Sequence, residues 1–189
     1  MNIGFAMCGS FCTYAAVFEA MQTVASIHTV IPIFSRAAYT MDSRFGTARE
    51  HIDRAAQICG QPPLHTIAQV EPIGPQKMLD ALVIAPCTGN TLAKLAHSIA
   101  DGPVTMAAKS HLRNGRPVLL AVSTNDALAG AAENIGRLLA RKNFYFVPFG
   151  QDDPEKKPTS MVADFSRLLP ALEAALEGRQ LQPMLYSRH

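Results

Sequence analysis

The chain has 189 residues, which is enough for one well-filled domain and too few for two. Its 17 basic and 15 acidic side chains nearly cancel and the basic ones are scattered, so we expect no nucleic-acid partner. No apolar run is long enough for a membrane helix, and residues 1–12 have neither a basic start nor a long hydrophobic stretch. We therefore expect a protein that is neither membrane-spanning nor exported.

The cysteines and histidines indicate neither a metal site nor a disulfide framework. The four cysteines form no C-x-x-C pair and the six histidines are dispersed, which favours a reducing cytoplasm. With 48% hydrophobic residues and no tryptophan, the composition is typical of a buried sheet covered by close-packed helices. The predicted fold class is therefore α/β.

Short apolar runs alternate with stretches of helical spacing along the chain. Pro32 inside the second run indicates an edge strand or a bulge, and Gly60 is a usual helix-stop residue. The pattern predicts strands at residues 2–7, 28–34, 64–67, 82–85, 117–122 and 144–147. It predicts helices at residues 13–25, 47–59, 91–99, 103–112, 127–142 and 161–176, and a charged loop at residues 150–158.

This alternation predicts a three-layer, Rossmann-like parallel sheet with helices on both faces. We place the domain at residues 1–178 and a loose C-terminal tail at residues 179–189. In such sheets ligands bind beyond the carboxyl ends of the strands, so the loops there should meet in one crevice. These loops follow Met7, Phe34, Ala85 and Val122.

The first of these loops, residues 8–13, suits an anion. It combines Gly9 with hydroxyl side chains at the start of a predicted helix, whose free N–H groups and dipole favour a phosphate. The alternative, with equal weight, is that Ser10 or Thr13 only caps the helix. Ser35, after the second strand, either adds a hydroxyl to the same anion or is an ordinary turn residue.

Residues 86–91, Pro-Cys-Thr-Gly-Asn-Thr, are the most informative stretch. They place several small or hydrogen-bonding residues after a buried strand, where capping needs only one, and so predict donors for a planar ring or a carboxylate. The alternative is that Asn90 or Thr91 serves as an N-cap. Residues 123–126, Ser-Thr-Asn-Asp, repeat the pattern after the next strand, where Asp126 can instead favour the start of its helix.

The loop at residues 150–158 is either a solvated loop or a mobile lid in which Lys156 and Lys157 meet an acidic substrate. The cysteines have no sequence-local base, so we expect no covalent catalysis. His65, His97 and His111 are acid/base candidates that nothing distinguishes from packing residues, and no catalytic residue is assigned.

Three segments together resemble the flavoprotein family: Gly9-Ser10, residues 35–38 and residues 80–94. That family includes phosphopantothenoylcysteine decarboxylase, the peptidyl-cysteine decarboxylases of lantibiotic synthesis and the flavin prenyltransferases, and the resemblance runs from about Ile3 to Val147. It implies a flavodoxin-like fold that binds FMN. The implied cofactor-binding residues are Gly9, Ser10, Phe11 and Ser35 near the phosphate, Thr88, Gly89, Asn90 and Thr91 near the ring, and Ser123.

Residues 101–109 and 123–126 resemble one branch of the family, whose members act with a separate dehydrogenase-like partner during sporulation. The resemblance implies a homo-oligomer in the cytoplasm of the mother cell, with NADP supplied through that partner. It also implies a small anionic substrate, a dicarboxylate precursor from the lysine pathway. The implied substrate-binding residues are Thr124, Asn125, Lys109 and Lys156.

The departures from the family pattern narrow the chemistry. The cysteine decarboxylases carry a histidine about fourteen residues before the proline that matches Pro86, and this chain has Pro72 there, so cysteine decarboxylation is not expected. Two alternatives remain open. The chain is a flavin prenyltransferase that uses FMN and dimethylallyl phosphate, or a non-catalytic scaffold for the dehydrogenase-like partner.

Overall fold

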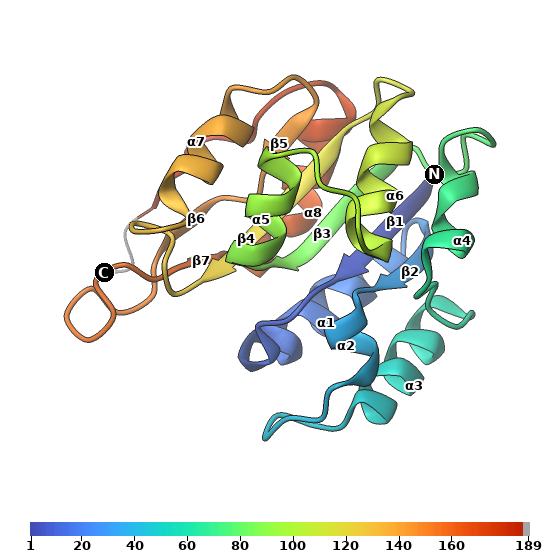
Figure 1. Ribbon diagram of the computed structural model, residues 1–189, viewed down its shortest axis with the longest axis horizontal. Coiled ribbons are helices and arrows are strands. Elements are labelled where there is room, and N and C mark those ends of the chain that lie inside the picture. The colour runs from blue at the N-terminus through green and yellow to red at the C-terminus, as the bar shows by residue number, and fades with distance from the viewer. Residues whose placement is uncertain (187–189) are drawn as a thin grey trace.

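The computed structural model describes residues 1–186 and contains one seven-stranded sheet with helices on both faces (Figure 1). The strand order is β2-β1-β3-β4-β7-β6, with β5 also beside β4. Strands β1 to β5 run parallel to one another. The predicted flavodoxin-like fold is thereby confirmed. The strands are β1 (Asn2–Met7), β2 (Thr29–Phe34), β3 (Ala81–Cys87), β4 (Val118–Thr124), β5 (Phe144–Phe146), β6 (Phe149–Gln151) and β7 (Met161–Ala163).

Two layers of helices cover this sheet. Helices α5, α6 and α7 lie in front of the sheet in Figure 1, and α4 packs on α6; α1 and α8 contact each other behind it, with α3 beside α1. The α-helices are α1 (Tyr14–Ala25), α2 (Arg36–Thr40), α3 (Ala48–Cys59), α4 (Ile67–Val70), α5 (Gly89–Ala96), α6 (Pro103–Leu112), α7 (Ala132–Leu139) and α8 (Leu168–Leu176). The short 3-10 turns are η1 (Phe11–Thr13), η2 (Glu71–Ile73) and η3 (Phe165–Arg167).

Burial explains the order of the strands. Every residue of β3 is buried, as are all but the last of β4, as expected for central strands with helices on both faces. Pro32 lies in β2, the last strand of the order at this side, whose one strand neighbour among the described residues is β1; beyond it lies only the isolated bridge to Leu64, so the expected edge position is confirmed. Among the described residues no helix is long and apolar enough to cross a membrane.

The predicted strand at residues 64–67 is wrong. Only Leu64 forms an isolated bridge, to Ile33, and the chain then turns into α4. The reason is local: Thr66 accepts a hydrogen bond from the backbone of Gln69, whose side chain bonds back to Thr66, and this capping box starts a helix. The same device, with Thr47 and Glu50, starts α3 where a helix was expected.

The predicted start of the last helix, at Met161, is also wrong. Residues 161–163 form β7, which pairs antiparallel with the end of β4 and with β6, and the helix begins only at Leu168. Strand β3 continues through Pro86 to Cys87 with an irregular register, although Pro86 was expected to end it. Helix α7 is shorter than predicted, since residues 127–131 form turns.

The chain after α8 is held against the sheet as far as Tyr186, although a loose tail was expected there. The side-chain amide of Gln180 accepts from the Phe146 N–H at 2.8 Å and donates to the Phe146 carbonyl at 2.7 Å. Leu185 forms a bridge with Phe149. The rest of the predicted tail, residues 187–189, lies outside the described residues, and the domain boundary at 178 stays a prediction.

Candidate functional site

A crevice of about 650 Å³ opens at the carboxyl ends of β1, β2 and β3. It gathers five of the residues that the sequence predicted for cofactor binding, as expected for loops that meet beyond parallel strands. The five are Gly9, Ser35, Thr88, Asn90 and Thr91. The other residues on its walls are Cys8, Arg36, Ala37, Thr40, Met41, Lys94, Asp101, Gly102, Pro103, Val104 and Thr105.

Thr88 fixes the start of α5 at one wall of the crevice. Its hydroxyl accepts from the Thr91 N–H at 3.3 Å, so Thr88 is the N-cap, a role that the sequence had offered to Asn90 or Thr91. The Thr91 hydroxyl lies 3.1 Å from that of Thr88 and donates to the Cys8 sulfur at 3.3 Å. Asn90 is exposed, and its side-chain amide has no partner among residues 1–186. Asn90 is therefore free to bind a ligand.

The other wall follows β2 and β1. Ser35 caps the short helix α2 by accepting from the Ala38 N–H at 3.2 Å, so its capping role is real and its hydroxyl proton remains to be donated. Gly9 carries no side chain into the crevice, and a Cβ there would meet only the Thr88 methyl, at 3.5 Å. The space beside Gly9 is thus open.

A second group of predicted residues lies at the end of β4. Ser10, in the left-handed region with φ of 64°, donates its hydroxyl to the Ser123 carbonyl at 2.8 Å. The Thr124 hydroxyl donates to Asp126, and the Asn125 carbonyl accepts from Thr159 at 2.7 Å. These residues meet at the same edge of the sheet as the crevice; the Ser10 and Thr124 hydroxyls are already bonded within the protein, whereas the exposed Asn125 side-chain amide has no partner among residues 1–186.

Gly89 joins the two groups. A Cβ on Gly89 would lie 2.8 Å from an Asp126 carboxylate oxygen and 2.9 Å from the Thr124 hydroxyl. This glycine therefore lets the start of α5 approach the turn after β4 closely. The predicted convergence of the strand-end loops does occur, with Gly89 at the point of contact.

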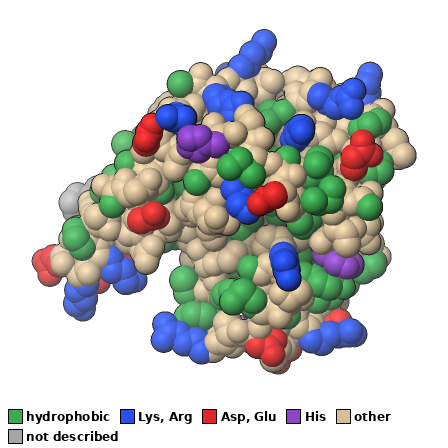
Figure 2. Space-filling model, in the orientation of Figure 1, with side chains coloured by type: hydrophobic (Ala, Val, Ile, Leu, Met, Phe, Trp, Pro, Cys, Tyr) green, Lys and Arg blue, Asp and Glu red, His purple; other side chains and the backbone are tan. Residues whose placement is uncertain are grey.

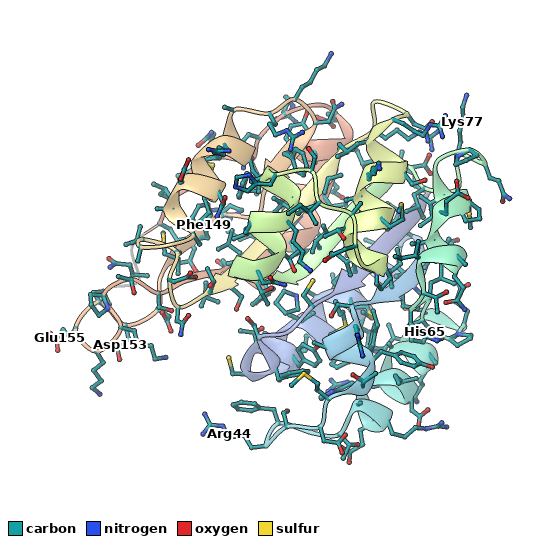
Figure 3. The ribbon with its side chains drawn as sticks, in the orientation of Figure 1. Arg44, His65, Lys77, Phe149, Asp153 and Glu155 are labelled. Carbon is teal, nitrogen blue, oxygen red and sulfur yellow. The ribbon has the colours of Figure 1, made fainter. Side chains whose placement is uncertain are left out.

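The remaining three predicted residues belong neither to the crevice lining nor to the group at the end of β4. Phe11 packs on Tyr14 and stacks on His51, toward α1 and α3. Lys109 lines a separate, smaller pocket of about 300 Å³ beside Arg141. Lys156 lies in the loop between β6 and β7, which projects from the body next to the labelled Asp153 and Glu155 (Figure 3).

The sequence reasoning missed three charged residues in the crevice. Lys94 Nζ lies 2.9 Å from both carboxylate oxygens of Asp101, and its hydrogen bond holds the pKa of that carboxyl below its usual range. Arg36 is exposed and has no partner within the described part of the chain. Only their positions in the sequence could have indicated two of these residues: Arg36 follows Ser35, and Lys94 comes one helical turn after Asn90.

The titratable groups argue against nucleophilic chemistry. Burial raises the pKa of the Cys8 thiol to about 11 and that of Cys87 well above its ordinary value, so both are neutral near pH 7. No histidine lines the crevice in residues 1–186: His65 stacks on Tyr39, and His111 is buried beside the Pro117 carbonyl. No group of three metal-ligating side chains occurs in the same stretch.

Comparisons with known proteins agree with this geometry. The sequence model of a family described as Flavoprotein matches residues 1–160. The B subunit of dipicolinate synthase from Bacillus subtilis (strain 168) is 44% identical over 189 residues, which is 100% of this chain and 94% of that protein. The crystal structure of the dipicolinate synthase B subunit from Bacillus halodurans has a TM-score of 0.91 at 44% identity and covers 100% of this chain and 97% of that one.

A more distant structure shares the fold. The crystal structure of DmrB from Burkholderia xenovorans in complex with FMN has a TM-score of 0.67 and covers 93% of this chain and 95% of that one. Its sequence identity of 18% means that the likeness shows the fold alone.

Proposed function

The chain belongs to the flavoprotein family, and from this premise we propose that it is the B subunit of a dipicolinate synthase. In this role it helps to form dipicolinate from a dihydrodipicolinate-type precursor during sporulation. The observation that carries the proposal is the crevice, where three strand ends present unfilled space and polar groups suited to an anionic ligand. Full-length similarity to the Bacillus subtilis protein supports the same role.

The crevice residues fit FMN. Its volume of about 650 Å³ lies within the usual range for small-molecule sites, roughly 300–1,000 Å³. Gly9 and Ser35 would hold the phosphate, and the Thr88–Thr91 turn would lie along the ring, which leaves the Asn90 amide for an anionic group of the substrate. Ser10 and Ser123 support this wall from behind through their hydrogen bond.

Bound FMN would supply hydride or electron transfer. The chain's own residues bind and orient the ligands, and they offer little proton chemistry: Cys8 stays neutral, and Lys94 holds Asp101 in its ionised form. We infer that the second component of the synthase is a dehydrogenase-like protein that carries NADP. A homo-oligomer in the mother-cell cytoplasm is part of the same proposal.

Co-expression with the dehydrogenase-like partner tests the function. We expect the purified complex to bind FMN by calorimetry and to form dipicolinate, and we expect Asn90→Ala to lower synthesis at least tenfold while the complex still assembles, because a hydrogen bond to a charged ligand group contributes about 1.5–3 kcal/mol. Gln57→Ala, an exposed amide on α3, is the matched control. A complex that shows no FMN binding and no synthesis contradicts the proposal.

The same experiment separates the alternatives. Full synthesis by the Asn90→Ala complex favours a non-catalytic scaffold over an active-site role. Turnover of dimethylallyl phosphate with reduced FMN, detected as prenylated flavin by mass spectrometry, would favour a flavin prenyltransferase.

A further inference from the structure

The crevice carries one ion pair and one unpaired cation. Lys94 and Asp101 bond across the turn that joins α5 to α6, and both side chains are partly exposed. Arg36, which has no partner among residues 1–186, starts α2 on the other side of the crevice. In the sheet order β2-β1-β3, the helices after β2 and β3 begin on either side of the β1 loop, so Arg36 and Lys94 line the crevice from different sides of that loop.

Lys94 also lies beside a free hydrogen-bonding group. Asn90 and Lys94 are four residues apart on α5, which places them on the same helix face, and both line the crevice. A carboxylate bound between the two side chains would contact both Lys94 and the Asn90 amide, whereas the Asp101 carboxylate bonds to Lys94 alone. Asp101 already shows how a carboxylate sits here, since both its oxygens bond to Lys94 Nζ at 2.9 Å.

We propose that a dicarboxylate substrate displaces Asp101 from Lys94, so that Lys94 and Asn90 bind one carboxylate and Arg36 binds the other. This inference rests on the proposed function and names the residues that select a pyridine-type dicarboxylate. Asp101 acts as an internal competitor: it holds Lys94 in place while the crevice is free of substrate and lowers the affinity for any ligand with a single weak anionic group. A dianion that displaces Asp101 also gains the contact with Arg36, and a monoanion bound to Lys94 does not.

The setting of the pair separates it from ordinary surface charges. Basic and acidic side chains are scattered over the face shown in Figure 2 without a broad patch of one sign, so general attraction does not select a dianion. The selection must come from side chains inside the crevice. A basic side chain close to the crevice is not enough: the pocket of Lys109 shares Thr105 with the crevice, but Lys109 does not line the crevice.

Calorimetry with dipicolinate on the FMN-loaded full chain tests this assignment. Lys94→Gln and Arg36→Gln should each weaken dipicolinate binding about tenfold, because each removes a charge-assisted contact. The affinity for the monocarboxylate picolinate should fall less than that for dipicolinate in at least one of these variants. Lys142→Gln, at an exposed lysine that does not line the crevice, is the matched control and should leave the affinity unchanged.

Asp101→Asn gives the decisive result. Loss of the competitor should tighten dipicolinate binding roughly 1.5- to 5-fold, the factor expected for releasing one partly exposed ion pair. The gain should vanish when Lys94→Gln is also present. Weaker binding in Asp101→Asn, a gain that persists without Lys94, or no dipicolinate binding by the wild type would each overturn the inference. FMN affinity, measured on the same samples, reports separately on the proposed function.

Discussion

The two halves of the strand-end edge differ in how their polar groups are used. At the ends of β1, β2 and β3, the Asn90 amide and the Arg36 guanidinium lack partners among the described residues, and the space beside Gly9 is open. At the end of β4, the Thr124 hydroxyl and the backbone carbonyls of Ser123 and Asn125 already have protein partners. An unfilled group can bind a ligand, whereas a filled one stabilises the fold.

This difference follows from the added strands. Strand β7 pairs with Ser123 and Thr124, so the last residues of β4 lie within a sheet instead of at a free edge. The Thr159 hydroxyl, just before β7, reaches the Asn125 carbonyl. The substrate-binding roles that the sequence suggested for Thr124 and Asn125 therefore stay predictions: the Thr124 hydroxyl is already bonded to Asp126, whereas the exposed Asn125 side-chain amide, like that of Asn90, has no partner among residues 1–186.

The largest effect is expected at the contact between the halves. Gly89→Ala should lower the free energy of unfolding by about 1–3 kcal/mol, because its Cβ would crowd the bonded Asp126 and Thr124 side chains. Urea unfolding measures the change. Gly136→Ala, in α7 with no atom within 4 Å of the added Cβ, is the control and should stabilise slightly. An equal free energy of unfolding in the two variants would mean that Gly89 is not needed for the close contact between α5 and the turn after β4.

A smaller effect is expected in the filled half. Thr159→Val should cost about 1 kcal/mol of stability, because it removes the hydrogen bond to the Asn125 carbonyl, and should leave FMN affinity within about twofold. Thr23→Val, where the hydroxyl bonds within an exposed part of α1, is the matched control. A large loss of FMN binding in Thr159→Val would place the ligand over β4 instead.

Near neutral pH, the smallest effect on the free energy of unfolding is expected from the thiols. At pH 8 we expect iodoacetamide to label Cys12, which is exposed, and to spare Cys8, whose pKa burial raises to about 11. Because the folded pKa is raised from 9.0, the stabilisation from the neutral Cys8 thiol is complete below about pH 9 and is lost as the pH rises toward 11. Mass spectrometry identifies the labelled residue, and Cys12→Ser should abolish fast labelling. Rapid modification of Cys8 would mean that its buried thiol, at the wall of the crevice, is accessible to the reagent.

The sequence predicted the parallel core because its strands are continuous apolar runs followed by turn residues. Strand β7 escaped prediction because three residues of mixed burial, Met161–Ala163, have no period of their own and gain their conformation by pairing with β4. Chain position likewise predicted Gly9, Ser35 and Thr88 in the crevice. The contact of Lys94 with Asp101 depends on the path of the turn between two helices, which no local pattern encodes.

Lys109 shows the same limit. It follows Thr105 by one turn of α6, and Thr105 lines both pockets, so a small rotation of the helix decides which one a side chain enters. That rotation is set by the packing of α6 on α4 and η2, which are distant in sequence from Lys109.

The paired hydrogen bonds between Gln180 and Phe146 also affect how molecules meet one another. Strand β5 has a sheet neighbour only in β4, so its outer side would expose an N–H and a carbonyl that another chain could pair with. Gln180 occupies both groups of Phe146 with one amide, as a residue of an adjacent strand would. A single side chain thus blocks strand-to-strand aggregation at this border, and Gln180→Ala should leave the molecule folded but more prone to aggregate.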